Sequence, residues 1–472
     1  MKNATLGIIL GNRDFFPDHL VKDARKEIIE LLQDMKINSV ILSENDTKFG
    51  GVETYRDAQK CSDLFKKHSD QIDGILVALP NFGDEKGIAD TLKMAGLNVP
   101  VLVQAYPDEL SAMDPSRRRD AFCGKISVCN NLTQAGIPFT LTEKHVVSPR
   151  DHSFDHDLKK FLAICRVVNG LRSTRIGAIG ARPGAFNTVR YSEKILEANS
   201  ISVTTVDLSE ILSHIKKLDA NDSLVKSSVE KIRQYADSAA VPAEKLVSMG
   251  KLDVALSEFI EANDLNATAI QCWTSVQENL GINVCTVMSM MSDKLIPSAC
   301  EVDVTGVLSM YALQLASGSP SALADWNNNY GDEDDKCVLF HCGNWAKTLV
   351  PNLKISTAPI LGTSVGDENT YGAMEGQIRK NPLTFARLST DDVNGVINGY
   401  VGEGKFTNDK LNTIGNSAVA QIPHLPDLMH FICDYGFEHH VAINLSHTAD
   451  VLMEAFEGYL GWEMYHHENH AH

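Results

Sequence analysis

Four short apolar runs rich in β-branched residues lie within the first 105 residues, and they constrain the fold of this 472-residue chain more than any other feature. The runs are TLGIIL (5–10), NSVILS (38–43), GILVALP (74–80) and VPVLVQA (99–105). Each has the length and composition of a strand buried on both faces, and helix-like stretches at 18–35 and 55–68 lie between them. Strands that alternate with helices in this way predict a parallel sheet with crossover helices.

A second α/β unit begins near residue 173, where RIGAI (175–179) predicts a strand that runs into the loop GARPG. This loop is a poor dinucleotide motif, because Pro183 interrupts the turn and Asp207 is the best available ribose-binding acid. One interpretation is that backbone N–H groups with Arg182 or Arg190 bind substrate oxygens. The other is an ordinary turn with surface arginines.

After residue 355 the pattern changes to short strand-like runs separated by glycine-containing turns, as in TFARLS, GVINGYVGEGKF and HHVAINL. This pattern is typical of an antiparallel sheet or small barrel. We therefore predict an α/β protein with two doubly wound, Rossmann-like domains and a C-terminal β-rich, barrel-like domain. The predicted ranges are 1–172, 173–355 and 356–472.

The formal net charge of −18 argues against nucleic-acid and anionic-membrane partners, which both require basic surfaces. Ten cysteines without a CxxC pair, several of them in apolar runs such as LFHCG and FICDYG, indicate reduced, buried thiols in a cytoplasmic protein. No apolar stretch approaches the length that spans a bilayer. We expect a cytoplasmic protein whose substrate is a small molecule.

The segment CEVDVTGVLSMYALQLASGSPSALADW (300–326) places acids on both sides of an apolar run. An unpaired buried carboxylate costs several kcal/mol or takes up a proton. A helix over 304–318 followed by a strand would return Asp325 to the side of Glu301, where the two carboxylates need a cation between them or one must hold a proton. With oxygen and imidazole donors and no thiolate cluster in the sequence pattern, Mn²⁺ or Mg²⁺ fits better than zinc.

Asp303 stands two residues from Glu301 and so points to another side of a helix or strand. We expect it to cap the helix or to support a ligand. Acids in a first helical turn are also favoured by the helix dipole, which gives a purely structural alternative. The three asparagines at 327–329 are typical of a loop.

Two histidine positions offer an imidazole. His341 follows the apolar run KCVLF and is either a pocket residue or a packed core histidine. His439 and His440 are adjacent in a predicted strand, so their side chains should point to opposite faces and only one should reach a given site.

These motifs resemble those of the L-fucose and L-arabinose isomerases over most of the chain. The most specific are ACEVDVTGVLSMYAL (299–313) and the following ADW (324–326). The resemblance implies that Glu301 and Asp325 bind Mn²⁺, with Mg²⁺ or Co²⁺ as substitutes, and act as the acid/base pair of a ketol isomerase. It also implies a metal histidine at His439. Since Glu438 replaces the asparagine of the family motif and the second histidine is displaced by one position, His440 is the alternative ligand.

The same resemblance implies an intramolecular oxidoreductase that interconverts a free aldose and its 2-ketose, assembled as a trimer or hexamer with sites near subunit interfaces. Arg13 resembles an arginine that reaches a neighbouring subunit's site, and His341 could take the role of an extra histidine in the arabinose branch. The full set of predicted substrate-binding residues is Arg13, Gln271, Trp273, His341, Asn344 and His440.

Two alternatives remain. The same scaffold could act on an acidic, sulfonated or otherwise modified sugar, whose anion would pair with Arg13, Arg182 and Arg190. The chain could also be a non-catalytic sugar-binding protein of the periplasmic type, although the missing signal peptide and the β-rich third range argue against it. A binder of that kind would show affinity without metal and no conversion.

Overall fold

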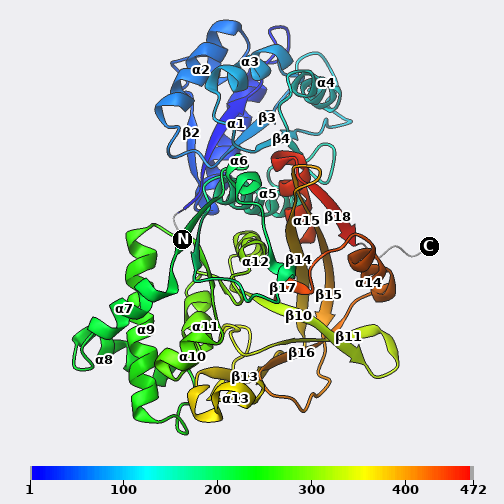
Figure 1. Ribbon diagram of the computed structural model, residues 1–472. Helices are drawn as coiled ribbons and strands as arrows, with labels where there is room; N and C mark the ends of the chain where they lie inside the picture. The colour runs from blue at the N-terminus through cyan, green and yellow to red at the C-terminus, as the bar shows by residue number, and fades with distance from the viewer. Residues whose placement is uncertain (1–2, 468–472) are drawn as a thin grey trace. The chain divides into compact units, whose positions relative to one another are not determined.

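The computed structural model describes residues 3–467 (Figure 1). The chain forms two compact units, one comprising the residues up to Asn169 with Glu454–Gly461, the other comprising Gly170–Met453 with the described residues after Gly461. Among the described residues, no helix is long and apolar enough to cross a membrane.

The first unit contains a five-stranded parallel sheet with strand order β2-β1-β3-β4-β5. Its strands are β1 (Thr5–Leu10), β2 (Asn38–Ile41), β3 (Gly74–Leu79), β4 (Val101–Ala105) and β5 (Thr140–Leu141). Its long helices are α1 (His19–Asp34), α2 (Tyr55–Lys67), α3 (Glu85–Ala95), α4 (Ala121–Gln134) and α5 (His152–Leu171). Apolar clusters fill both sides of the sheet, with α2, α3 and α4 on one side and α1 and α5 on the other. The four strands and two helices predicted from the sequence are confirmed, but the prediction that each strand is buried on both faces is wrong for β2, an edge strand whose residues are exposed or half-buried.

The second unit begins with a four-stranded parallel sheet in the order β7-β6-β8-β9. Its strands are β6 (Arg175–Ile179), β7 (Ser202–Val206), β8 (Ala267–Ile270) and β9 (Ser298–Ala299). The helices of this part are α6 (Glu193–Ala198), α7 (Leu208–Lys217), α8 (Ser223–Tyr235), α9 (Ala243–Ala262), α10 (Ser275–Leu280), α11 (Cys285–Asp293) and α12 (Val304–Ser317).

A nine-stranded mixed sheet forms the rest of this unit, in the order β12-β13-β16-β11-β10-β17-β14-β15-β18. Its strands are β10 (Ser321–Tyr330), β11 (Glu333–His341), β12 (Lys354–Ser356), β13 (Ala373–Gln377), β14 (Asn381–Asp391), β15 (Val396–Phe406), β16 (Asn416–Gln421), β17 (His440–Asn444) and β18 (Glu463–His467). The helices are α13 (Pro359–Val365), α14 (Leu425–Asp434) and α15 (Ala449–Met453). A further pairing of β15 with β16 closes the ring β16-β11-β10-β17-β14-β15. A large β-rich C-terminal sheet is therefore confirmed.

The sheet differs from the prediction in where its strands come from. β10 and β11 precede residue 355, yet they pair with β16 and β17, which follow it. The prediction of a loop at 327–329 is wrong, because β10 continues to Tyr330 and turns into β11 at Gly331. Gly331 has a φ of +60°, which glycine adopts without steric cost, and this allows the tight turn of the hairpin. The three asparagines are exposed and lie on the β10 arm of that hairpin.

The cysteines are not uniformly buried. All ten are free thiols, and Cys123 and Cys433 are exposed. Cys433 lies at the end of the amphipathic helix α14, whose buried residues are spaced so that this position faces solvent. The prediction that an apolar run buries its cysteine is therefore wrong at this position.

Candidate active site

The candidate site lies where the parallel sheet of the second unit ends beside the mixed sheet. Glu301 stands two residues after the end of β9, at the carboxyl edge of the parallel strands, where ligands bind in α/β sheets. As predicted, α12 leads the chain away and β10 returns it, with Asp325 on β10. Asp325 stands opposite His440 of β17 in the antiparallel register, so the two side chains share one face of the sheet.

Glu301 is buried, and its two carboxylate oxygens have different surroundings. Oε1 accepts hydrogen bonds from Trp273 Nε1 at 3.1 Å and from Cys272 Sγ at 3.3 Å. Oε2 has no hydrogen-bond partner among the described residues. It lies 3.8 Å from His341 Nε2 and 3.9 Å from His440 Nε2. A buried oxygen of this kind indicates a site for a positively charged group.

His440 is oriented by a carboxylate. Its Nδ1 lies 2.8 Å from Asp303 Oδ2, so the ring donates its N–H there and leaves Nε2 directed at Asp325 Oδ1, 3.4 Å away. Burial lowers the pKa of the His440 imidazolium, but the hydrogen bond and charge of Asp303 outweigh it, and the pKa is raised. When Nε2 carries no proton, a ring held in this way presents a free nitrogen, the arrangement in which histidines bind metal ions.

Asp303 in turn belongs to a buried ionic network. Its carboxylate accepts from Arg387 Nη1 at 2.6 Å and caps α12 by accepting from the N–H of Gly306 at 2.8 Å. Arg387 also pairs with Glu438 at 3.0 Å. Burial alone would raise the pKa of Asp303, but Arg387 and His440 hold it well below its usual range. Asp303 is thus a capping acid that orients His440.

The prediction that His439 and His440 point to opposite faces is wrong. His439 Nε2 lies 3.6 Å from Asp325 Oδ1, on the same carboxylate oxygen that His440 approaches. The physical reason is that β17 begins at His440, so the alternation of strand side chains does not extend to His439. The two rings differ in burial, since the His439 side chain is 43% exposed and that of His440 is 2% exposed.

His341 ends β11 and is buried, with Nε2 turned toward Glu301 and Nδ1 accepting from the backbone N–H of Cys342 at 2.9 Å. Burial lowers the pKa of His341, but the Cys342 thiol and the carboxylates of Asp325 and Glu301 raise it to about 9. His341 is therefore a buried core histidine whose Nε2 lies beside Glu301.

Trp273 contributes an aromatic wall. Its indole donates to Glu301, and its ring meets the edge of Phe186 at a centroid distance of 5.5 Å. The Phe186 ring also makes an edge contact with the His439 ring, at a centroid distance of 5.8 Å. Aromatic faces of this kind suit the C–H surfaces of a sugar.

Gln271 and Asn344 use their amides to hold the backbone. Gln271 Oε1 accepts from the N–H of Ala181 at 2.9 Å, and its Nε2 donates to Ser275 Oγ at 3.3 Å. Asn344 is buried and donates to the carbonyl of Ser298 at 3.4 Å. Both residues lie beside the segments that carry the site, and sugar contact by either one stays a prediction.

Arg13 belongs to the first unit. It donates to the carbonyl of Gly83 at 3.0 Å, pairs with Glu85 and lies 4.1 Å from the ring centre of Phe82. These bonds occupy its guanidinium within its own chain. Its predicted role at a neighbouring subunit's site stays a prediction.

Arg182 and Arg190 line a cleft of about 590 Å³. Val302, which follows Glu301, and Glu438, which precedes His439, line the same cleft. The hydrogen bonds of the two arginines go to backbone carbonyls, from Arg182 to Phe186 at 3.4 Å and from Arg190 to Asn187 at 3.3 Å. Within residues 3–467, neither forms an ion pair with a carboxylate. Their charge is therefore available to an anion in the cleft.

The residues present fit a divalent cation. Two groups of side chains could hold an ion, and within each group the ligand atoms lie within 4.8 Å of one another. One group is Glu301, His341 and His440, and the other is Asp325, His439 and His440. Four carboxylates lie in or beside the site (Glu301, Asp303, Asp325 and Glu438), and among them Arg387 pairs with Asp303 and Glu438, which leaves Glu301 and Asp325 to the imidazoles. A divalent ion between these oxygen and nitrogen donors would offset the charge of these two carboxylates.

Sequence reasoning missed the partners that support the site. Arg387 was not singled out, although a lone arginine inside the apolar strand TFARLS is a signal for a buried ion pair. The gathering of Cys272, Cys285, Cys300 and Cys342 was also missed, and the prediction of no thiolate cluster is wrong. These cysteines are far apart in sequence, so no local pattern identifies the cluster.

Comparison with known proteins places this chain in a family. Residues 7–172 match the model of the fucose/sulfoquinovose isomerase N-terminal domain, and residues 339–467 match that of the L-fucose isomerase C-terminal domain. Sulfoquinovose isomerases of Priestia aryabhattai and Priestia megaterium are each 24% identical over 392 residues, covering 81% of this chain and 83% of theirs. A sulfoquinovose isomerase of a Clostridium species is 25% identical over 240 residues, covering 47% of this chain and 52% of its own. The chain therefore belongs to the fucose isomerase family and is an isomerase of the intramolecular oxidoreductase class.

Proposed function

We propose that this protein is a metal-dependent aldose–ketose isomerase whose substrate is an anionic sugar, with a sulfonated hexose as the leading candidate. The observation that carries the metal site is the buried Glu301 Oε2, which has no hydrogen-bond partner among the described residues and faces two imidazole nitrogens. The names of the relatives support a modified sugar over the unmodified aldose of our first expectation.

The proposed ligands are Glu301, Asp325 and His440. The free Nε2 of His440, fixed by the hydrogen bond of Nδ1 to Asp303, supports this choice over His439. His341 faces the same oxygen of Glu301 and is the nearest additional donor. Carboxylate and imidazole donors suit Mn²⁺, with Co²⁺ or Mg²⁺ as substitutes.

Isomerisation requires a proton to leave C2 of the aldose and to return at C1, while the hydroxyl proton moves from O2 to O1. The divalent ion would act as a Lewis acid for the negative charge that develops on the two oxygens. Glu301 and Asp325 are the carboxylates available to take and return the carbon-bound proton. The hydrogen bond from Trp273 fixes the plane of the Glu301 carboxylate, which keeps Oε2 directed into the site.

The anionic group of the sugar would lie in the cleft lined by Arg182 and Arg190. Sulfonate and carboxylate oxygens accept charge-assisted hydrogen bonds from guanidinium groups, often in pairs. Since Val302 and Glu438 line the same cleft, the anion would sit beside the segments that carry Glu301 and His439. The rings of Trp273 and Phe186 would cover the sugar carbons between the two ends.

The deciding experiment loads the chelated protein with Mn²⁺ and follows C2-proton exchange in D₂O by NMR. The panel contains sulfoquinovose, L-fucose, L-arabinose and glucose. We expect metal-dependent exchange and ketose formation with the sulfonated sugar above the neutral ones. No exchange with any sugar would refute the isomerase site, whereas equal exchange with neutral sugars would refute only the anion preference.

A pair of variants tests the cleft directly. Arg182→Met should raise KM for the sulfonated sugar by about 10–100-fold, the worth of a charged hydrogen bond, and should change KM for a neutral sugar much less. Arg175→Met is the matched control, because Arg175 stands at the opposite end of the strand that leads to Arg182 and donates to the carbonyl of Asn263. A larger effect of the control would contradict the assignment.

A further inference from the structure

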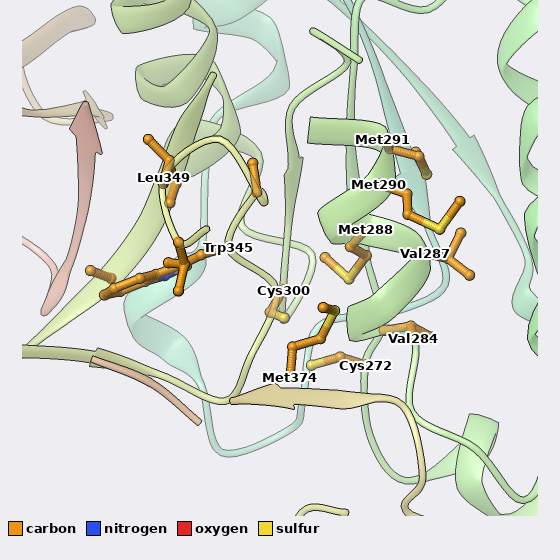
Figure 2. Close-up of a cluster of buried hydrophobic side chains, with 14 of the residues drawn as sticks. Cys272, Val284, Val287, Met288, Met290, Met291, Cys300, Trp345, Leu349 and Met374 are labelled. Carbon is orange, nitrogen blue, oxygen red and sulfur yellow. The ribbon is translucent and has the colours of Figure 1, made fainter. Parts of the chain in front are cut away.

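Four cysteine side chains meet beside Glu301. Cys272 follows β8, Cys285 begins α11, Cys300 follows β9 and Cys342 follows β11, so each comes from a different element of the second unit. Figure 2 shows Cys272 and Cys300 within the core cluster that also contains Met288 and Met374. Neither the family match nor the proposed isomerisation uses these thiols.

The spacing of the sulfur atoms is that of metal ligands. Cys342 Sγ lies 3.7 Å from Cys285 Sγ and 3.9 Å from Cys300 Sγ. All three sulfurs lie within 4.8 Å of one another. Thiolates bound tetrahedrally at about 2.3 Å from Zn²⁺ lie about 3.8 Å apart. The three thiols are therefore spaced for one thiophilic ion without movement of the backbone.

A fourth thiol adjoins this triad. Cys272 Sγ lies within 4.8 Å of both Cys300 Sγ and a carboxylate oxygen of Glu301. Cys272, Cys285 and Cys300 are buried, while Cys342 is partly exposed and opens the cluster to solvent. The surroundings thus combine a closed, sulfur-rich interior with one accessible ligand.

We propose that Cys285, Cys300 and Cys342 form a second metal site, selective for a thiophilic d¹⁰ cation such as Zn²⁺. Each thiol that binds the ion releases its proton to solvent, and no electron is transferred. Thiolates select such ions over Mn²⁺ and Mg²⁺, so neither of those two ions should occupy this site.

Occupation of this site should inhibit the isomerase, a consequence that rests on the proposed function. Cys300 directly precedes Glu301, Cys342 directly follows His341, and Cys272 donates to Glu301 Oε1. An ion on the three sulfurs places its positive charge beside Glu301 and His341. Zn²⁺ bound at the thiols should therefore lower kcat, and this part of the inhibition should depend on Cys285.

The test titrates the reduced, Mn²⁺-loaded full chain with Cd²⁺ and records the ultraviolet thiolate-to-Cd²⁺ charge-transfer band. Oxygen and imidazole ligands give no such band, so this measurement needs no activity. The variants are Cys285→Ala, which removes one ligand, and Cys337→Ala, a matched control at a buried thiol of β11 outside the cluster. We expect one Cd²⁺ equivalent bound with the band in wild type and in Cys337→Ala, and at least about a tenfold loss of affinity in Cys285→Ala.

The outcomes separate the two sites. The thiolate site would be overturned, whatever the sugar assays show, if wild type gave no charge-transfer band or if Cys285→Ala gave the same band and Cd²⁺ affinity as wild type. Thiols that only form a disulfide in air, seen as a loss of two hydrogen masses, with no Cd²⁺ band after reduction, would also overturn it. Zn²⁺ inhibition that is lost in Cys285→Ala and kept in Cys337→Ala would support the link to the isomerase.

Discussion

Two neighbouring histidines, His439 and His440, differ in what holds them. His440 is buried and has its Nδ1 on Asp303, whereas the His439 side chain is 43% exposed, and burial together with the charge of His440 lowers its pKa. A ligand needs a fixed ring with a free nitrogen, and His440 meets this requirement. A strand pattern alone cannot separate the two residues, because the start of β17 decides which ring is fixed.

Loss of a residue that only orients a metal ligand usually lowers metal affinity by about 10–100-fold. His440→Gln removes a proposed ligand itself, so it should lower Mn²⁺ affinity by more than this. His439→Gln should lower it by less, since that side chain is only one of two imidazoles near Asp325. Calorimetric titration of the chelated proteins with Mn²⁺ measures both. A larger loss in His439→Gln would assign the metal to His439, as the family resemblance first suggested.

Asp303→Asn should destabilise the second unit by about 3–5 kcal/mol at neutral pH, because it leaves the buried Arg387 short of a counter-charge. The pKa of Asp303 is lower in the folded protein than in the unfolded chain. Its ionised form therefore stabilises the fold fully above the unfolded pKa, and this contribution is lost as the pH falls below about 3.9. The difference between wild type and variant should shrink toward about pH 3.

Urea unfolding of the two proteins at neutral and acidic pH measures this difference. Asp391→Asn serves as the control, because Asp391 caps an exposed turn by accepting from Val393 and Asn394. It should change the free energy of unfolding by about 1 kcal/mol or less. A pH-independent loss in Asp303→Asn would show that packing, and not charge, is responsible.

The elements that carry the site depend on one tight loop after β11. Gly343 has a φ of +123°, and a Cβ there would overlap the backbone nitrogen and oxygen of Met374. Both facts require glycine, which is the residue that allows the chain to pass β13 and place Cys342 and Asn344. The sequence HCGNW does not show why glycine is needed at 343, because the constraint comes from the distant Met374.

Gly343→Ala should destabilise the protein by at least about 1–3 kcal/mol and should reduce isomerase activity through displacement of His341. Gly184→Ala is the matched control, since a Cβ at Gly184 meets nothing within 4 Å. Thermal unfolding and steady-state turnover of both variants test this. Equal melting temperatures for the two would contradict the steric argument.

Metal binding should couple to the stability of the second unit, because all the proposed ligands lie in it. An ion that binds only the folded state at about 100 times its Kd stabilises that state by about 2.7 kcal/mol. Scanning calorimetry of the chelated and Mn²⁺-loaded protein should show this as a rise in Tm. His440→Gln should lose most of the rise, and a full rise in that variant would exclude His440 as a ligand.

Local sequence was sufficient for much of this fold. The β-branched runs of the first unit became β1 to β4, and the apolar middle of 300–326 became α12 followed by β10, because these periodicities and lengths act within a few residues of chain. The family resemblance also predicted a metal site at the acids 301 and 325, which stays a prediction. Strand partners were harder, since β10 and β11 pair across the boundary that composition suggested at residue 355.

By itself, then, the sequence determined most of the strand and helix segments and the family, and it predicted the pair of carboxylates Glu301 and Asp325. Only the tertiary structure decided that His440 is the fixed imidazole, that Asp303 and Arg387 hold it, and that four cysteines meet beside Glu301. Each of these depends on contacts between residues far apart in the chain, such as the 137 positions between Asp303 and His440. The pairing register of the strands and the burial of their side chains determine such contacts, and a local sequence pattern predicts neither.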